Sequence, residues 1–386
     1  MSDVVLISTA EFALKSQPVR QLLIRLLKRH IRFNLKRIGL EKCNITQAGG
    51  FLIVGGLEDA EKAAKELAQV FGVAHAEPCQ RTRLDLEEIA ECAVRQAKQK
   101  LKPGETFAIR ARNFEPSQIK GKEIEVRAGA EVLSRLPSGL KVNLSNPDHT
   151  IRVFYGAKEA FVSSARFDGP SGLPVGSQGR LLGLANDPAY GPLSFYLLMK
   201  RGAMVSPVIP NIPALLGKTR PEEIIEGLRK LAPLVPKKDY SVRLVELDHD
   251  TSRALNEMDR PLQTVITVRL VYRALAHLIQ TERVLGLVTA DALGRNGLES
   301  LKDLRVIEDI VKFPVYRPLL ALDDETMNRE LAERGLLQLA RSEAIGQPDR
   351  PSLSDASDGN LQELEERVHA EDLAKRIAVN STRILI

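Results

Sequence analysis

Apolar residues recur every three or four positions along residues 17–37, which predicts an amphipathic helix. The apolar positions are Val19, Leu22, Leu23, Leu26, Leu27, Ile31 and Leu35. Most positions between them carry positive charge: residues 15–42 hold nine Lys and Arg against the single acid Glu41. The predicted outer face is therefore almost wholly basic. Positive charges this close together repel each other, which is unfavourable unless a bound anion compensates them. The alternative interpretation is a solvent-exposed surface with no binding role.

Short apolar runs and helical patterns alternate through the first part of the chain. Strands are expected at residues 4–7, 44–46, 51–54 and 73–76, and helices at 17–37 and 58–71. This β-α-β-β-α-β order matches a ferredoxin-like unit that closes near residue 77. A second mixed unit follows, with helices at 85–100 and 121–133 and strands at 106–110, 141–143, 150–155 and 159–164.

From residue 180 onward apolar strands alternate with helices at the spacing of a parallel, doubly wound sheet. The strands are expected at 203–209, 241–246 and 284–288, and the helices at 191–201, 221–231, 262–280 and 323–333. A polar linker at 346–360 then precedes a last amphipathic helix at about 361–378. We predict a multi-domain α/β chain with domains at 1–77, 78–172 and 173–345 and a tail at 346–386.

Composition narrows the class of protein. The chain has 386 residues, 44% hydrophobic and 27% charged, so most of it can fold into domains with hydrophobic cores. No apolar stretch reaches the about 18 residues that span a bilayer, and we expect no membrane partner and a cytoplasmic location. Residues 1–180 carry 28 Lys and Arg against 20 acids, whereas 181–386 carry 27 against 30. A polyanion would therefore bind the first half.

Several local motifs, in one order over more than 300 residues, resemble the tRNA 4-thiouridine synthase family. Glu11-Phe-Ala-Leu-Lys15 resembles its amino-terminal motif, and Phe107-Ala-Ile-Arg-Ala-Arg112 resembles a strand of its THUMP RNA-binding domain. Gly172-Leu-Pro-Val-Gly-Ser-Gln-Gly179 resembles the hinge into its ATP pyrophosphatase domain, the PP-loop domain. Tyr196-Leu-Leu-Met-Lys-Arg-Gly202 and Val315-Tyr-Arg-Pro-Leu319 resemble the helix after the phosphate loop and a later pocket segment.

The resemblance implies a ferredoxin-like unit, a THUMP unit and a PP-loop domain, in that order. It also implies a homodimer that docks at the acceptor end of tRNA and uses ATP and magnesium to make 4-thiouridine.

The phosphate loop departs from the family pattern. Where the family reads S-G-G-x-D-S-P, this chain reads Asn186-Asp-Pro-Ala-Tyr-Gly-Pro192. A phosphate loop needs consecutive backbone N–H groups, small side chains and the positive end of a helix. Asp187 places an anion at the phosphate position, Pro188 removes a donor, and Tyr190 introduces a bulky ring. Gly191 begins the helix, whose dipole alone contributes only about 0.3–1 kcal/mol to anion binding.

The second pocket segment departs in the same direction. The glycine that admits the nucleotide in the family is Ala290 here, and Glu299 stands in place of a closing glutamine. Arg269 matches a pocket arginine of the family, although an ion-pair arginine is the alternative. We therefore expect residues 186, 187, 190, 191, 269, 290 and 299 to be a vestigial nucleotide site without ATP or magnesium.

Sulfur transfer requires a thiolate of low pKa, and the family places a cysteine after the Arg-Pro-Leu segment. Here that stretch has none, since Cys43, Cys79 and Cys92 all lie in the first half. No catalytic residue and no metal site is predicted, because the histidines are scattered and no zinc spacing is present. His249 lies between Asp248 and Asp250; in a strand, as we expect here, these two carboxylates would face away from the imidazole.

Two functional hypotheses remain open. The first is a tRNA-binding relative of the synthases that has lost adenylation and sulfur transfer. Its cations would hold phosphates and read RNA by shape. They are Lys15, Arg25, Arg29, Arg32, Lys36, Arg37, Arg110, Arg112, Lys120 and Lys122. The second is an active tRNA sulfurtransferase that uses ATP, magnesium and an external persulfide donor.

A weaker idea concerns the acidic carboxy-terminal helix, which could recruit a protein partner. Its acids are Glu363, Glu365, Glu366, Glu371 and Asp372. The alternative is a helix that caps the last domain.

Overall fold

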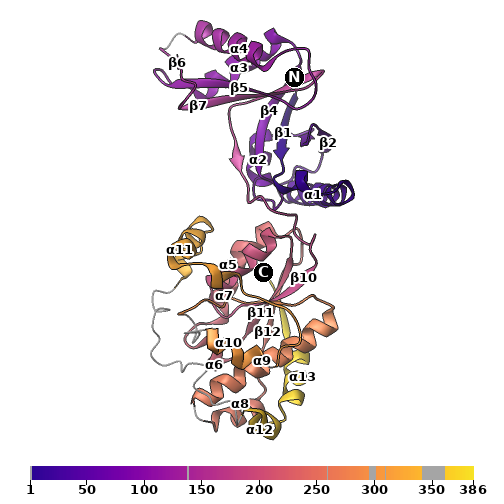
Figure 1. Ribbon diagram of the computed structural model, residues 1–386, viewed down its shortest axis with the longest axis vertical. Helices are drawn as coiled ribbons and strands as arrows, with labels where there is room; N and C mark the ends of the chain where they lie inside the picture. The colour runs from indigo at the N-terminus through magenta and orange to yellow at the C-terminus, as the bar shows by residue number, and fades with distance from the viewer. Residues whose placement is uncertain (1, 137–138, 259, 295–300, 309, 341–360) are drawn as a thin grey trace. The chain divides into compact units, whose positions relative to one another are not determined.

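The computed structural model describes residues 2–136, 139–258, 260–294, 301–308, 310–340 and 361–386. These residues form two compact units, Met1–Pro174 (unit 1) and Val175–Ile386 (unit 2). Each unit is built on a sheet of its own (Figure 1). The chain is therefore a mixed α/β protein, as expected from the alternation of its sequence patterns.

Unit 1 contains a nine-stranded sheet whose main path runs β2-β3-β1-β4-β8-β7-β5-β6, with β9 paired to β4. Its strands are β1 (Ser2–Ser8), β2 (Asn44–Ala48), β3 (Phe51–Gly55), β4 (His75–Arg83), β5 (Thr106–Asn113), β6 (Lys141–Val142), β7 (His149–Tyr155), β8 (Glu159–Ser163) and β9 (Phe167–Asp168). Its helices are η1 (Glu11–Leu14), α1 (Gln17–Arg37), α2 (Ala60–Leu67), α3 (Leu86–Lys100) and α4 (Gly121–Arg135).

Strand β4 joins the two halves of this sheet. It pairs antiparallel with β1 over His75–Arg81 and with β8 over Gln80–Arg83. Ala76 packs in the core under α1 and α2, whereas the Thr82 hydroxyl donates to Glu88 of α3 at 2.7 Å. Residue 77, the expected boundary between the first two domains, lies inside this strand, which is longer than the four residues expected.

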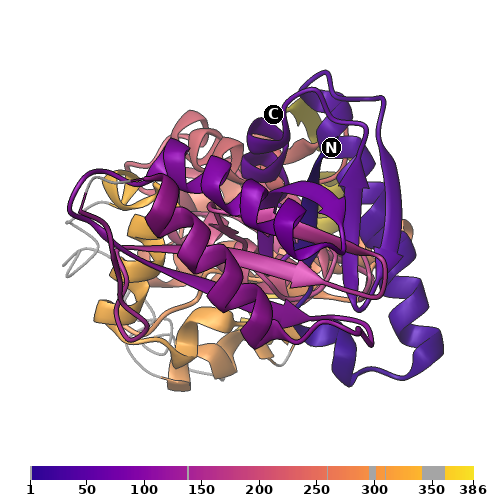
Figure 2. The same ribbon diagram turned by 90° about the horizontal axis from the view of Figure 1, so that it is seen from above.

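The sheet of unit 1 is strongly curled. Phe51 of β3 and Phe154 of β7 are separated by three strands, so a flat sheet would place them about 19 Å apart. Their ring centroids are only 5.4 Å apart. A small core of Val4, Leu6 and Phe161 packs with these rings on the concave side. Helices α1 to α4 cover the opposite face, and Figure 2 shows α3 and α4 side by side over the strands.

Acidic side chains cap two helices of unit 1, α2 and α3. The Asp59 carboxylate accepts the Lys62 N–H at 2.9 Å before α2. Asp85 accepts the N–H groups of Glu87 and Glu88, both at 3.0 Å, before α3. Such caps satisfy amide donors that have no partner inside the helix, so they set where each helix begins.

Unit 2 contains a six-stranded sheet in the order β14-β13-β10-β11-β12-β15. Its strands are β10 (Arg180–Leu184), β11 (Met204–Pro210), β12 (Ser241–Val245), β13 (Leu287–Val288), β14 (Val315–Tyr316) and β15 (Thr382–Leu385). All pairs are parallel except β12 with β15. Its longer helices are α5 (Tyr190–Lys200), α7 (Pro221–Leu231), α8 (His249–Asn256), α9 (Arg260–Glu282), α10 (Leu301–Glu308), α11 (Asp324–Glu333), α12 (Leu361–Arg367) and α13 (Ala370–Val379). Short turns of helix are α6 (Pro213–Leu216), η2 (Ala232–Leu234), η3 (Pro318–Ala321) and η4 (Leu337–Leu339).

Helices cover both faces of this sheet. Phe195 of α5 packs against Gly183 and Val205, where a Cβ on Gly183 would come within 2.6 Å of its ring. On the other face, Leu182 and Val208 belong to a core with α9 and α13. This is the doubly wound arrangement expected from the alternation of strands and helices after residue 180. α9 is long and apolar enough to cross a membrane by length and composition, but 61% of its apolar window is buried inside the structure.

The carboxy-terminal segment is part of unit 2. Instead of one continuous helix, α12 and α13 are separated at His369, whose φ is 50°. Leu373 and Ile377 are buried in the core with α9, and β15 then extends the sheet beside β12. The helix therefore caps the domain with its apolar face, while Glu363, Glu366, Glu371 and Asp372 are exposed. The expected linker at 346–360 lies outside the described residues.

Two local expectations were wrong. His249 starts α8 and does not lie in a strand, because Asp248 caps this helix by accepting the Thr251 N–H at 2.8 Å. The strand expected at 284–288 is reduced to Leu287–Val288, since Val284 and Gly286 form the turn that follows α9.

Candidate nucleotide crevice and RNA surface

The parallel sheet of unit 2 has a topological switch point beside β10. The chain leaves β10 through α5 to β11 on one side and later enters β13 on the other side. In open α/β sheets, ligands bind in the crevice outside the carboxyl ends of such strands. The loop 185–189 after β10 and the segment 289–294 after β13 both lie at this edge. The predicted residues Asn186, Asp187, Tyr190, Gly191 and Ala290 are therefore brought to this edge of the sheet, which we call the nucleotide crevice after its counterpart in other α/β proteins.

The carboxylate of Asp187 occupies the amino terminus of α5. Its Oδ1 accepts the backbone N–H of Ala189 at 2.7 Å and of Tyr190 at 2.8 Å. These are amides at the start of the helix, the group of donors that bind phosphate when a loop of this kind holds a nucleotide. The Asp187 side chain of the loop itself therefore occupies two of these donors.

The Tyr190 ring fills the space next to this cap. It is 3% exposed and packs with Ala290, Leu193 and Leu319. The loop also packs closely against α7. A Cβ atom added to Gly227 of this helix would lie only 1.9 Å from the Pro188 carbonyl oxygen. With donors engaged and a ring in place, these residues do not fit a triphosphate cradle.

An ion pair at the other side of the crevice was not found from the sequence. Asp291 accepts the Thr289 hydroxyl at 2.7 Å and the Arg317 Nε–H at 2.9 Å. Arg317 is the arginine of the Arg-Pro-Leu segment, and its side chain is 11% exposed. In the sequence, Asp291 and Arg317 each follow a short strand. In the structure these strands, β13 and β14, are parallel neighbours, so the loops that follow them meet.

Arg269 is engaged by the carboxy-terminal helix. Its Nε and Nη2 donate to the two carboxylate oxygens of Glu365 in α12, at 2.9 and 3.0 Å. Its Nη1 donates to the Val306 carbonyl, and the residue is 3% exposed. Burial raises the pKa of Glu365, but hydrogen bonds from Arg269 and Arg273 outweigh burial and hold this pKa below its ordinary value. Arg269 is thus an ion-pair arginine of the core, and Glu299 lies outside the described residues.

The three cysteines do not offer an activated sulfur. Cys79 and Cys92 are buried and Cys43 is half-buried. Burial raises the pKa of all three thiols. Since the thiolate is the nucleophile, this environment disfavours sulfur chemistry. Within the described ranges, no group of three His, Cys, Asp or Glu side chains could hold a metal ion.

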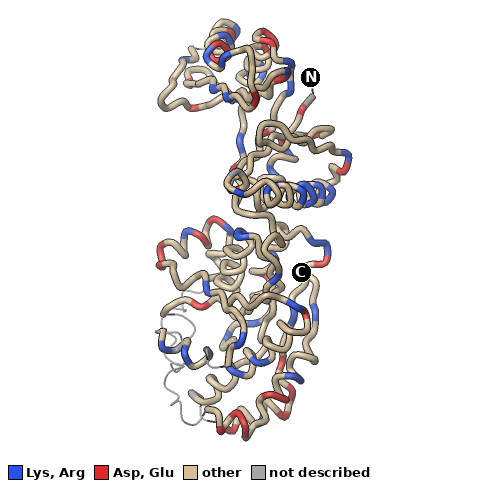
Figure 3. Tube along the Cα trace, turned by 45° about the vertical axis from the view of Figure 1, so that its right-hand side comes forward, with Lys and Arg blue, Asp and Glu red and all other residues tan. Residues whose placement is uncertain are grey.

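The basic face predicted for α1 is present. Figure 3 shows Lys and Arg along this helix, and Lys15, Arg25, Arg29, Arg32 and Lys36 are exposed. In the described part of the chain Arg25, Arg29 and Arg32 have no acidic partner, whereas Lys36 lies 3.8 Å from Glu41 and Arg37 pairs with Glu66. Its apolar stripe is narrower than expected, because Val19 and Leu22 are 43% and 53% exposed.

The cations of the second half of unit 1 lie in two places. Arg110 and Arg112 project from β5 on the side away from α3 and α4, and Arg112 stacks over the Phe51 ring at 5.5 Å. Arg110 donates to the Leu144 carbonyl. Lys120 and Lys122 are instead at the start of α4, where Lys122 lies 3.9 Å from Glu125.

Arg152 was not among the predicted RNA-binding cations. It is paired in register with Arg110 across β5 and β7, so the two side chains share one face of the sheet. Its alternation with the buried Ile151 and Val153 could have revealed it.

Comparison with known proteins gives a consistent assignment. Residues 4–76 match the ThiI ferredoxin-like domain, residues 83–165 the THUMP domain, and residues 176–343 the family described as thiamine biosynthesis protein (ThiI). A probable tRNA sulfurtransferase of Methanocaldococcus jannaschii is 26% identical over 362 residues, covering 90% of this chain and 92% of that protein. One from Methanosarcina mazei is 26% identical over 392 residues, covering 100% of this chain and 95% of that protein.

The fold agrees with these matches. A crystal structure of a 4-thiouridine synthetase–RNA complex with bound ATP is similar over the full length of both chains, with a TM-score of 0.82 and 20% identity. Fold and sequence together define a protein with a ferredoxin-like unit, a THUMP unit and a ThiI-type α/β domain. The chain belongs to the tRNA 4-thiouridine synthase (tRNA sulfurtransferase) family.

Proposed function

We propose that this chain is a tRNA-binding member of its family that no longer adenylates tRNA or transfers sulfur to it. We also expect it to act in the cytoplasm as a homodimer, without ATP or magnesium as cofactors. The observation that carries the proposal is the Asp187 carboxylate on the first amides of α5, because the cradle for a triphosphate depends on those donors.

Retention of RNA binding is supported by unit 1. The THUMP domain is present, and two relatives that cover 90% and 100% of this chain are named probable tRNA sulfurtransferases. The guanidinium groups of Arg25, Arg29 and Arg32, which pair with no acid among the described residues, lie on one exposed helix face. Such a face binds phosphates by charge and needs no base contacts, which suits recognition of a folded RNA by its shape.

Loss of adenylation is supported by three independent contacts in unit 2. Asp187 takes the amide donors, Tyr190 fills the adjoining space, and Arg269 is held by Glu365. Restoring a nucleotide site would require changes at each of these places, so a single substitution should not recover it. The raised thiol pKa values supply a separate argument against sulfur transfer.

The RNA-binding part of the proposal is tested by filter binding of the full chain to bulk tRNA between 50 and 300 mM salt, about the range over which phosphate contacts lose most of their affinity. We expect micromolar or tighter binding that weakens steeply with salt. No retention of tRNA at low salt would overturn it.

The alternative function is an active tRNA sulfurtransferase that uses ATP, magnesium and an external persulfide donor. It is favoured only by membership of the family and by the names of its relatives. Titration calorimetry with ATP and magnesium separates the two functions, since we expect no saturable heat at millimolar ATP. Formation of 4-thiouridine by the purified protein with a persulfide source would establish the alternative.

A further inference from the structure

A second hollow lies in unit 2, at the edge of the sheet opposite the nucleotide crevice. Arg180, Met204 and Ser241, the first residues of β10, β11 and β12, line this pocket of about 370 Å³. α9 covers this face of the sheet only as far as its last residue, Glu282, which borders the pocket. Beyond the helix end the strand beginnings are left uncovered, so the pocket follows from the length of α9.

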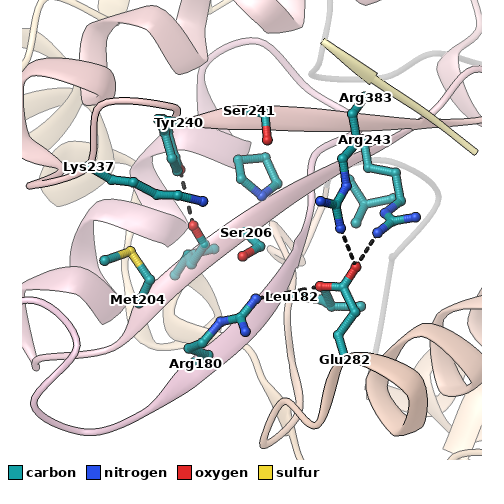
Figure 4. A pocket seen from close by; sticks show the side chains of 13 residues that line it. Arg180, Leu182, Met204, Ser206, Lys237, Tyr240, Ser241, Arg243, Glu282 and Arg383 are labelled. Atoms are coloured by element: carbon teal, nitrogen blue, oxygen red, sulfur yellow. Dashed lines mark hydrogen bonds and ion pairs between the residues drawn. The ribbon is translucent and has the colours of Figure 1, made fainter. Parts of the chain in front are cut away.

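Positive side chains converge on this pocket. Arg180 comes from β10, Arg243 from β12, Arg383 from β15, and Lys237 from the loop before β12. Figure 4 shows the three arginines directed toward Glu282, with Lys237 extending toward the same space. Four strongly basic groups thus face a single carboxylate among the residues that line the pocket.

The carboxylate of Glu282 is shared by all three arginines. Arg180 lies 3.5 Å and Arg383 3.0 Å from its oxygens, and Arg243 donates to it directly. One carboxylate has about four acceptor positions, whereas each guanidinium has five N–H donors. Most donors in this group therefore have no acceptor in Glu282, and the pocket keeps a positive excess of three charges when Lys237 is included.

Two features indicate a binding site and not only an exposed ion-pair network. The side chain of Arg243 is 15% exposed and its Nη1 donates to the Ser381 hydroxyl at 2.6 Å, so this arginine is fixed in place. Lys237 is exposed and has no ion-pair partner in the described part of the chain. A pre-positioned guanidinium beside an unpaired ammonium is the arrangement that binds phosphate oxygens strongly.

We infer that this pocket binds a terminal phosphate or diphosphate group. The volume is at the lower end of the range typical of small-molecule sites, about 300–1,000 Å³, which suits a compact ligand and not a duplex backbone. The hydroxyls of Ser206 and Ser241 also line the pocket and supply neutral donors. This inference is independent of the proposed loss of nucleotide binding, because no residue of the nucleotide crevice takes part in it, and only the comparison of tRNA forms below rests on the proposed tRNA binding.

The ligand group could belong to a small molecule or to the end of an RNA, and the probes distinguish these sources. Pyrophosphate and AMP are titrated into the full chain by calorimetry, and tRNA binding is compared with and without its 5′-phosphate. We expect saturable pyrophosphate binding in the micromolar to low-millimolar range. A loss of tRNA affinity on dephosphorylation would assign the site to an RNA end, and unchanged affinity would assign it to a small molecule.

Lys237→Gln is the informative variant, because its ammonium is exposed and its removal should not disturb folding. We expect about a tenfold loss of pyrophosphate affinity, the lower end of what one hydrogen bond to a charged group contributes. Lys238→Gln is the matched control, since Lys238 is the neighbouring exposed lysine and does not line the pocket. Equal affinity in both variants, or no saturable binding to the wild-type chain, would overturn the inference.

Discussion

The Asp187 carboxylate accepts the backbone N–H of Tyr190 at 2.8 Å, so the loop after β10 supplies the anion for its own helix. A second bond to the Ala189 N–H at 2.7 Å makes this a two-donor cap. Caps of this kind stabilise a helix end and remove its attraction for an external anion. The same contact therefore stabilises the helix and weakens its binding of an external anion, and the two effects can be measured separately.

Removing the Asp187 cap should destabilise unit 2 without creating a nucleotide site. We expect Asp187→Ala to lower the free energy of unfolding by about 1 kcal/mol, the usual cost of losing a carboxylate cap. Urea denaturation measures this change. Calorimetry on the same variant should detect no ATP binding, because the Tyr190 ring still fills the adjoining space. Asp239→Ala, at an exposed loop position, is the control and should change neither quantity.

The basic face of α1 should dominate the salt dependence of tRNA binding. Replacing Arg25, Arg29 and Arg32 with glutamine should lower tRNA affinity at low salt and reduce the slope of log affinity against log salt by about 2. The loss should be similar for different tRNAs, because phosphate contacts carry no sequence information.

The matched control for this variant removes three exposed cations from unit 2, namely Arg229, Lys230 and Lys238. If both triple variants lose the same affinity, the effect reflects net charge and the α1 surface is not the binding site.

Glu365 should be among the most sensitive positions in unit 2. Glu365→Ala leaves the buried Arg269 without its bidentate partner, so we expect a loss of about 3–5 kcal/mol in unfolding free energy. The exposed neighbour Glu366→Ala should cost almost nothing. Replacing the pair together, as Arg269→Met with Glu365→Leu, should recover most of the loss. A double variant as unstable as the single one would contradict this account.

His30 should make unit 1 sensitive to acid. Burial, with a smaller effect of Arg29, lowers the pKa of His30 from 6.5 to about 4. The unfolded chain therefore binds the proton first, so the stabilising contribution is present above pH 6.5 and is lost as pH falls toward 4. The full effect is about 3 kcal/mol.

Urea denaturation at pH 7, 5.5 and 4 tests the effect of His30. His30→Gln should flatten the pH dependence over this window, whereas His249→Gln, at a fully solvated position, should leave it unchanged. A parallel pH dependence in wild type and His30→Gln would exclude the histidine as the cause.

Most elements were predictable because their signals are local. The spacing of apolar residues in α1 and the alternation in β7 depend only on neighbours in the chain, and the structure confirms both elements. The helix of His249 was missed because its signal is a cap, Asp248, and not an apolar period. β15 was missed because an edge strand of mixed polarity acquires its conformation from pairing with β12.

Sequence alone determined the domain types, the basic face of α1 and the substitutions in the phosphate loop, since each is a matter of residue identity at a given spacing. Only the tertiary structure decided what those residues contact. That Glu365 reaches Arg269 across 96 positions and that the Phe51 ring meets the Phe154 ring are outcomes of long-range packing, whereas Asp187 bonds amides only two and three residues further along the chain. The partner of a charged or aromatic side chain depends on which elements the fold brings together, and no local pattern encodes that choice.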